Sequence, residues 1–223
     1  MKKIKHDMAL TFGAKKLHSG RKFMYKAVEA THKKYIGKNS FYKKKYLEHR
    51  NCPLCNSQKK NTLFQKRGGI YRRCIKCELI YLDPVFKDTE LTKYYQNLHD
   101  AQSIVTKNES SFYKKIYTLG LKSIEKLRKK GSILDIGCSS GFFLDLAKIR
   151  GWKTFGIELG RKEAKIAKLN HEVFEKDVEL LDKSKKFDVI TMWDVIEHIK
   201  NGNKALKHMR DRLKKKGMFW FNF

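Results

Sequence analysis

The feature that most constrains the fold is the alternation of short apolar runs with amphipathic segments in the second half of the chain. Five runs have the length of β-strands: 132–137, 153–158, 172–177, 187–193 and 218–223. Four segments between or before them have helical spacing and endings: 110–131, 142–151, 161–170 and 203–217. Strands that alternate with helices in this way predict βαβ units with right-handed crossovers, and therefore an α/β fold with a doubly wound parallel sheet.

The length of 223 residues leaves room for one sizeable α/β domain and a smaller module. We expect a basic N-terminal extension (1–50), a zinc-binding module (51–82), a helical linker (83–130) and the α/β domain (131–223). No run reaches the roughly 18 apolar residues of a membrane span, and the basic N-terminus lacks the apolar core of a signal peptide. These absences predict a cytoplasmic protein without a membrane span.

The net charge of +28 raises the question of a nucleic-acid partner. The excess is +12 in residues 1–50 and only +6 in residues 131–223, so it lies mainly upstream of the α/β domain. Lysine outnumbers arginine, although arginine is the better ligand for phosphate. The charge therefore fits a general lysine bias with a solvated surface as well as it fits a phosphate-binding face, and nucleic acid is not the favoured partner.

Four of the five cysteines form two CxxC pairs, Cys52 with Cys55 and Cys74 with Cys77, separated by eighteen residues. This spacing is typical of a tetrahedral zinc site, in which two knuckles supply four thiolates. Four protein ligands leave no open coordination position, so we expect a structural Zn²⁺ whose binding is coupled to folding. Cys138 stands apart, and we expect it to be a small buried residue.

The stretch GSILDIGCSSGFF (131–143) places a glycine-bearing turn directly after the first apolar run. A dinucleotide-binding turn would need a glycine where Phe142 stands, and a P-loop would need Gly-Lys-Ser/Thr, which is absent. Asp135 would also repel a pyrophosphate. With a cationic ligand the interaction with Asp135 would be attractive instead of repulsive. S-adenosylmethionine carries an ammonium and a sulfonium but no phosphate. The turn therefore favours S-adenosylmethionine as cofactor.

The pattern Asp135-x-Gly137-x-Ser139-x-Gly141 resembles motif I of the class I S-adenosylmethionine-dependent methyltransferases, with Ser139 at the position of the middle glycine. Two further acids end the second and third apolar runs. Glu158 would face the ligand crevice and accept the ribose hydroxyls, and the resemblance places Asp177 on the adenine amino group. Cys138 in the turn, and Leu159 and Val178 directly after the two acids, complete the expected cofactor site.

Asp194, Glu197 and His198 follow the fourth apolar run at positions i, i+3 and i+4, so on a helix they would share one face. Three interpretations remain open. The acids can be helix N-terminal residues favoured by the helix dipole beside a surface histidine. His198 or Asp194 can act as a general base. The arrangement also resembles that of ubiquinone-pathway O-methyltransferases, which implies a divalent metal.

The stretches YRRCIKCELIYLDP and ELTKYYQNLHD resemble a group of bacterial methyltransferases in which a small zinc-binding module precedes the catalytic domain. That group, which includes sugar C-methyltransferases, is similar over about residues 50–223. The class I fold has seven strands, whereas five are expected here and the sequence stops at the fifth, which indicates a domain truncated at its C-terminus. The resemblance implies methyl transfer to a small molecule or sugar. An RNA methyltransferase, or a non-catalytic zinc protein with a degenerate fold, remains the alternative.

Overall fold

The computed structural model describes residues 25–26, 28–93 and 110–222. Residues 1–24 of the basic extension and residues 94–100 of the ELTKYYQNLHD stretch lie outside the described residues. The chain divides into two compact units. The second unit contains the expected α/β domain together with Asn51–Lys60 and Cys74–Tyr81, the two segments that carry the paired cysteines.

The N-terminal part is built from short elements. Residues 28–35 are helical and are followed by the 3₁₀ turn η2 (Lys44–Tyr46) and strand β1 (Leu47–Glu48), which pairs antiparallel with β5 (Val85–Phe86). Strands β2 (Lys60–Lys66), β3 (Gly69–Cys74) and β4 (Ile80–Leu82) form a separate three-stranded sheet. Arg67 and Gly68 join β2 to β3 with φ values of 47° and 85°, the left-handed conformation that a two-residue hairpin turn requires.

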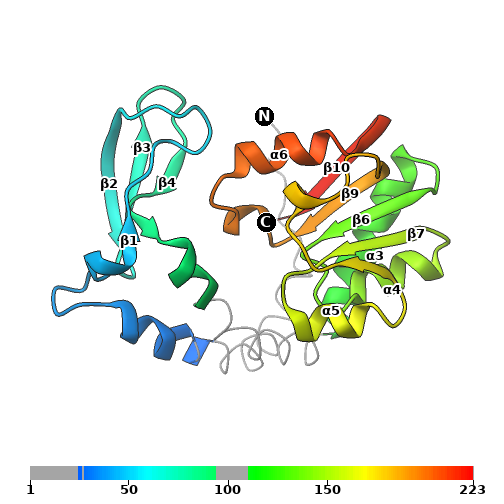
Figure 1. Ribbon diagram of the computed structural model, residues 1–223, viewed down its shortest axis with the longest axis horizontal. Helices are drawn as coiled ribbons and strands as arrows, with labels where there is room; N and C mark the ends of the chain where they lie inside the picture. Colours follow the sequence, from blue (N-terminus) through cyan, green and yellow to red (C-terminus); the bar gives the residue numbers. More distant parts are fainter. Residues whose placement is uncertain (1–24, 27, 94–109, 223) are drawn as a thin grey trace, which may run out of the picture. The chain divides into compact units, whose positions relative to one another are not determined.

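The α/β part contains a five-stranded sheet in the order β10-β9-β6-β7-β8 (Figure 1). Its strands are β6 (Ser132–Ile136), β7 (Lys153–Ile157), β8 (Glu172–Phe174), β9 (Phe187–Trp193) and β10 (Leu213–Asn222). Every neighbouring pair is parallel, so the predicted doubly wound sheet is confirmed. The strand order reverses between β6 and β9, and in such sheets ligands bind at the carboxyl ends of the strands on either side of this reversal.

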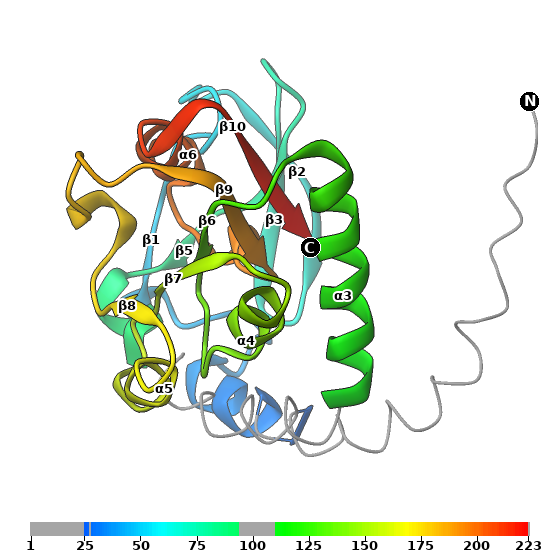
Figure 2. The same ribbon diagram turned by 90° about the vertical axis from the view of Figure 1, so that its right-hand side faces the viewer.

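Helices cover both faces of this sheet. One core cluster contains apolar side chains of α3 (Ser110–Leu127), α4 (Phe142–Ile149) and α5 (Arg161–Ala167). The other contains Ala205 and Met209 of α6 (Gly202–Arg210). Figure 2 shows α3 and α6 on opposite sides of the strands. Among the described residues, no helix combines the length and apolarity needed to cross a membrane.

Helix α3 buries a narrower face than its apolar residues suggest. Leu119 and Leu127 are 55% and 66% exposed, whereas Gly120, Leu121 and Ile124 are buried. Gly120 faces the indole of Trp193, and a Cβ atom there would lie 2.4 Å from Trp193 Cη2. The close approach of helix and sheet therefore depends on a residue that has no side chain.

The expected helix over 203–217 is wrong in its second half, because α6 ends at Arg210 and Leu213 already belongs to β10. The cause is Arg212, which is 1% exposed. Its guanidinium donates to the carbonyl oxygens of His208 and Leu181. Because a buried charge needs such partners, the chain leaves the helix where Arg212 can reach them.

Candidate functional site

The turn between β6 and α4 is held in left-handed backbone conformations at three residues. Gly137, Ser139 and Gly141 have φ values of 73°, 49° and 90°. The Gly137 amide donates to Ile157 O at 2.8 Å, and a Cβ atom on Gly137 would lie 2.7 Å from Val195 Cγ2. At position 137 both the backbone conformation and the neighbouring Val195 require a glycine. At position 139 the backbone is also left-handed, but a side chain is accommodated.

Asp135 lies in β6 and is 2% exposed. Its Oδ1 accepts a hydrogen bond of 2.7 Å from the Thr191 hydroxyl of the neighbouring strand β9. Burial raises the pKa of the Asp135 carboxyl to about 8, and the negative charge of Glu158 adds to this effect, while the Thr191 hydroxyl opposes it. Near neutral pH the group is therefore mostly a neutral acid that a nearby cation would ionise.

Glu158 directly follows β7 and is 8% exposed. Its Oε2 accepts from the Ser139 amide at 2.8 Å, and its Oε1 accepts from the Gly160 amide at 2.7 Å. A carboxylate has about four acceptor sites, so Glu158 retains capacity to accept hydroxyl donors. Leu159, which follows it, is 66% exposed. The structure thus places the Glu158 carboxylate in hydrogen-bond contact with the turn 137–141, which follows Asp135.

Cys138 is 4% exposed and is the small buried residue that we expected. Its Sγ occupies space opposite Gly156 of β7, where a Cβ atom would lie 2.5 Å away. Burial raises the pKa of the thiol, with the carboxyls of Asp135 and Glu158 adding to the effect, so the thiol stays protonated. Cys138 is suited to packing rather than to nucleophilic chemistry.

Asp177 does not end a strand, because β8 stops at Phe174. It is exposed and precedes the 3₁₀ turn η3 (Val178–Leu180), where its Oδ1 accepts from the Glu179 amide at 3.2 Å. Val178 is 3% exposed and belongs to the core. Asp177 is therefore placed by a capping interaction rather than by the sheet.

Asp194, Glu197 and His198 do not lie on an α-helix, the arrangement in which they would share one face. The segment forms only the 3₁₀ turn η4 (Ile196–His198), and Asp194 has a left-handed φ of 52°. All three side chains are exposed. Within the described residues, the one group of three or more metal-ligating side chains is that of the paired cysteines. These three residues thus do not converge into a metal site, although all of them follow β9 at the carboxyl edge of the sheet.

Two residues of this edge were not identified from the sequence. Thr191 is the hydrogen-bond partner of Asp135, and its signal was a lone hydroxyl in the apolar run FDVITMW. Val195 packs onto Gly137 and explains why that glycine has no side chain. Nothing in the local sequence pairs Val195 with Gly137, because the contact depends on the turn after β9.

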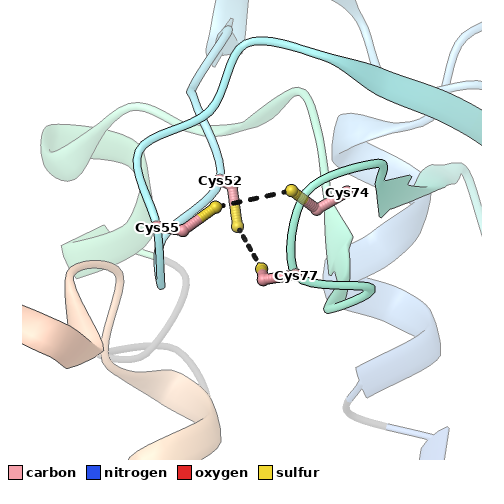
Figure 3. A group of neighbouring side chains, drawn as sticks. All are labelled: Cys52, Cys55, Cys74 and Cys77. Carbon is pink, nitrogen blue, oxygen red and sulfur yellow. Dashed lines mark hydrogen bonds between the residues drawn. The ribbon is translucent and has the colours of Figure 1, made fainter.

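The four paired cysteines converge on one point, as Figure 3 shows. Their Sγ atoms all lie within 4.8 Å of one another, with 3.5 Å between Cys52 and Cys77 and between Cys55 and Cys74. A tetrahedral zinc ion with Zn–S bonds of 2.3 Å requires sulfur atoms about 3.8 Å apart, so the cluster fits zinc.

The surroundings of the cluster act in opposite directions on two of its thiols. Burial raises the pKa of Cys74, but the amides of Cys77 and Lys76 and the neighbouring thiols outweigh this effect and lower the pKa to about 6. Backbone amides that point at a sulfur atom stabilise its negative charge. At Cys77 the Leu79 amide lowers the pKa, but burial and the three neighbouring thiols outweigh it and raise the pKa to about 12. The predicted four-cysteine set is therefore brought together, with Cys74 as the thiol that ionises most readily.

Residues 108–222 match the methyltransferase domain family. The ubiquinone biosynthesis O-methyltransferase of Pelagibacter ubique (strain HTCC1062) is 28% identical over 107 residues, which cover 45% of this chain and 45% of the relative. That of Paramagnetospirillum magneticum (strain ATCC 700264 / AMB-1) is 30% identical over 95 residues, 40% of this chain and 38% of the relative.

Among solved structures, the PH0226 protein of Pyrococcus horikoshii OT3 aligns with a TM-score of 0.44 at 26% identity, over 49% of this chain and 53% of that one. The chain spans less than half the length of the two curated relatives.

Proposed function

This chain belongs to the methyltransferase domain family, and we propose that it transfers a methyl group from S-adenosylmethionine to an oxygen atom of a small-molecule acceptor. The observation that carries the proposal is the buried Asp135 at the end of β6, next to a glycine turn that Glu158 closes. Such a site favours a ligand with cationic groups and hydroxyls over one with phosphates.

Each side chain of this edge has a proposed role. Asp135 faces the cationic methionine end of the cofactor, and the small residues of the turn allow the ligand to approach the backbone. Glu158 accepts hydrogen bonds from the ribose hydroxyls. Asp177 contacts the adenine amino group, and the exposed Leu159 completes the contacts around the nucleoside.

The acceptor is proposed from the names of the relatives, both ubiquinone biosynthesis O-methyltransferases. A lone pair of the acceptor oxygen attacks the methyl carbon, and the electrons of the breaking C–S bond stay on sulfur, which becomes a neutral thioether. The acceptor hydroxyl loses its proton to a base. His198 and Asp194 are exposed after β9 and are the candidates for that base. Because the sulfonium is already activated, catalysis is mostly alignment of oxygen, carbon and sulfur.

We propose that the cysteine cluster holds a structural zinc ion. Four thiolates complete the tetrahedron, so no position remains for a catalytic water. The role of zinc here is to stabilise the short segments around β2, β3 and β4, whose side chains are mostly exposed in β2. Two CxxC pairs that converge on one site suit a metal in a reducing compartment, and we propose the cytoplasm as the location.

RNA is the second candidate acceptor, and one observation favours it. The rings of Phe64 and Tyr71 stack at 4.7 Å on neighbouring strands, and Phe64 is 46% exposed. The surrounding residues 51–77 contain no acid and seven basic residues, which are Lys59, Lys60, Lys66, Arg67, Arg72, Arg73 and Lys76. A partly exposed aromatic pair among basic residues is typical of single-stranded nucleic-acid binding. A steep loss of RNA affinity with salt would support this candidate, and weak binding insensitive to salt would remove it.

The proposal is tested by calorimetric titration of the zinc-loaded protein with S-adenosylhomocysteine. We expect micromolar binding that is lost in Glu158→Gln. The matched control is Glu172→Gln, which changes an exposed acid at the opposite end of the neighbouring strand β8 and should leave binding unchanged. A folded protein that does not bind would refute the proposal.

Transfer from methyl-labelled S-adenosylmethionine to hydroxylated aromatics, nucleotide-linked sugars and RNA then identifies the acceptor class. Label on a small hydroxyl compound supports the proposed acceptor. Label on a carbon atom of a sugar, or on RNA, would contradict the proposed acceptor and identify the sugar or the RNA as the acceptor instead.

A further inference from the structure

The buried histidine of this domain, His171, lies between α5 and β8 and has no role in the proposed chemistry. Its side chain is 1% exposed. Nδ1 lies 2.9 Å from the Thr154 hydroxyl of β7, and Nε2 lies 3.0 Å from Asp145 Oδ1 of α4. A carboxylate can only accept hydrogen bonds, so Nε2 carries the hydrogen and donates a hydrogen bond to Asp145. Both ring nitrogens are therefore satisfied by side chains from two different elements.

His171 also contacts the glycine turn from behind. A Cβ atom on Gly141 would lie 3.1 Å from His171 Cδ2, and Gly141 has a φ of 90°. The Gly141 carbonyl accepts from the Asp145 amide at 2.8 Å, while the Asp145 carboxylate accepts from His171. Gly141, Asp145 and His171 thus form a closed set of contacts, in which the imidazole lies against the last glycine, beside Ala167, and is hydrogen-bonded to the first turn of α4.

Space filling alone would not require a histidine. A leucine could occupy a buried site of this size without any polar partner, whereas burial of an imidazole is tolerated only because both nitrogens are hydrogen-bonded. The directional bonds to Thr154 and Asp145 fix the orientation of the ring, and the ring edge in turn limits the movement of Gly141. A ligand that binds against the turn benefits from such rigidity because less ordering remains to be done on binding.

We propose that His171 is a positioning residue, which holds the turn 137–141 in the conformation that binds the cofactor. This inference rests on the proposed function, because the turn is taken to be the cofactor site. It extends that function to a residue outside the cofactor contacts. His171 acts through Gly141 and Asp145 and touches no reacting atom.

Three variants separate positioning from packing in calorimetric titrations with S-adenosylhomocysteine. His171→Leu keeps the bulk and removes both hydrogen bonds, and we expect its Kd to rise by roughly tenfold. His171→Gln can donate to Asp145 and accept from Thr154 through its amide, so it should restore most of the affinity. Met209→Ala empties a buried site on the other face of the sheet, and it should lower the melting temperature without changing Kd. Equal Kd values for His171→Leu and the wild type overturn the proposal, as does a rise of the same size in Met209→Ala.

Hydrogen exchange without any ligand tests the same inference independently of the proposed function. The amides of Gly141 and Asp145 are bonded within the turn and the first turn of α4, at 3.0 and 2.8 Å. In His171→Leu they should exchange faster than in the wild type, while amides of the inner strand β9 stay protected. If the wild type does not bind S-adenosylhomocysteine, the proposed function fails, but faster exchange at Gly141 still supports the role of His171. Unchanged exchange at both amides contradicts it.

Discussion

Cofactor binding at the end of β6 should strengthen as the pH rises from 6 to 8, because Asp135 must lose its proton to meet a cation. The pKa of this carboxyl is raised to about 8, mainly by burial. With that value only about 1% of the protein has ionised Asp135 at pH 6. Because only this fraction binds, the apparent Kd for S-adenosylhomocysteine should rise roughly tenfold for each pH unit below the pKa. Binding at pH 7 should release close to one proton.

The same shift affects stability with the opposite sign. The usual pKa of the carboxyl is 3.8, so from pH 4 to pH 8 the unfolded chain has lost this proton while the folded protein keeps it. Stability due to this group therefore falls as the pH rises through that window, by an upper bound on the order of 5 kcal/mol. Asp135→Asn keeps an acceptor for Thr191 but cannot ionise. It should unfold with a flatter pH dependence than the wild type and should bind S-adenosylhomocysteine poorly at every pH.

Calorimetry from pH 6 to pH 8, in pairs of buffers with different heats of ionisation, measures both the Kd and the number of protons released. His198→Gln is the control, because it removes the exposed histidine that follows β9 and leaves Asp135 in place. The Cys138 thiol does not interfere, since burial raises its pKa further from neutrality. A Kd that does not vary with pH, or the same pH dependence in Asp135→Asn, would refute the assignment of Asp135 as the residue that meets the cation.

Three further predictions concern the scaffold. Cys74→Ser should abolish stoichiometric metal binding, measured as zinc content and as the tetrahedral thiolate spectrum of the Co²⁺ form, because one of four converging ligands is lost. Gly137→Ala should destabilise the domain by about 1–3 kcal/mol in urea unfolding, since it adds a Cβ atom 2.7 Å from Val195 to a backbone with φ 73°; an unchanged midpoint would contradict the geometry of the turn. Arg212→Met should cost no more than about 2 kcal/mol in the same assay, because it leaves carbonyl acceptors without a donor but buries no unpaired charge.

Local patterns in the sequence were enough to predict much of this protein. The alternation of apolar runs and helical segments predicted the order of the elements and the parallel sheet, since periodicity and length are properties of a single segment. The spacing of Cys52, Cys55, Cys74 and Cys77 predicted their convergence, because two CxxC turns each bring two sulfur atoms to one point. The turn at 137–141 was recognisable from glycines at positions that require a left-handed backbone.

Other features depended on contacts between segments far apart in the chain, and only the tertiary structure decided them. The end of α6 is determined by the carbonyl partners of Arg212, and the buried face of α3 by the approach of Gly120 to Trp193. The raised pKa of Asp135 arises from its burial between neighbouring strands, and the partners of His171 come from α4 and β7. Burial and hydrogen bonding are set by what surrounds a side chain, so no local pattern could have predicted them.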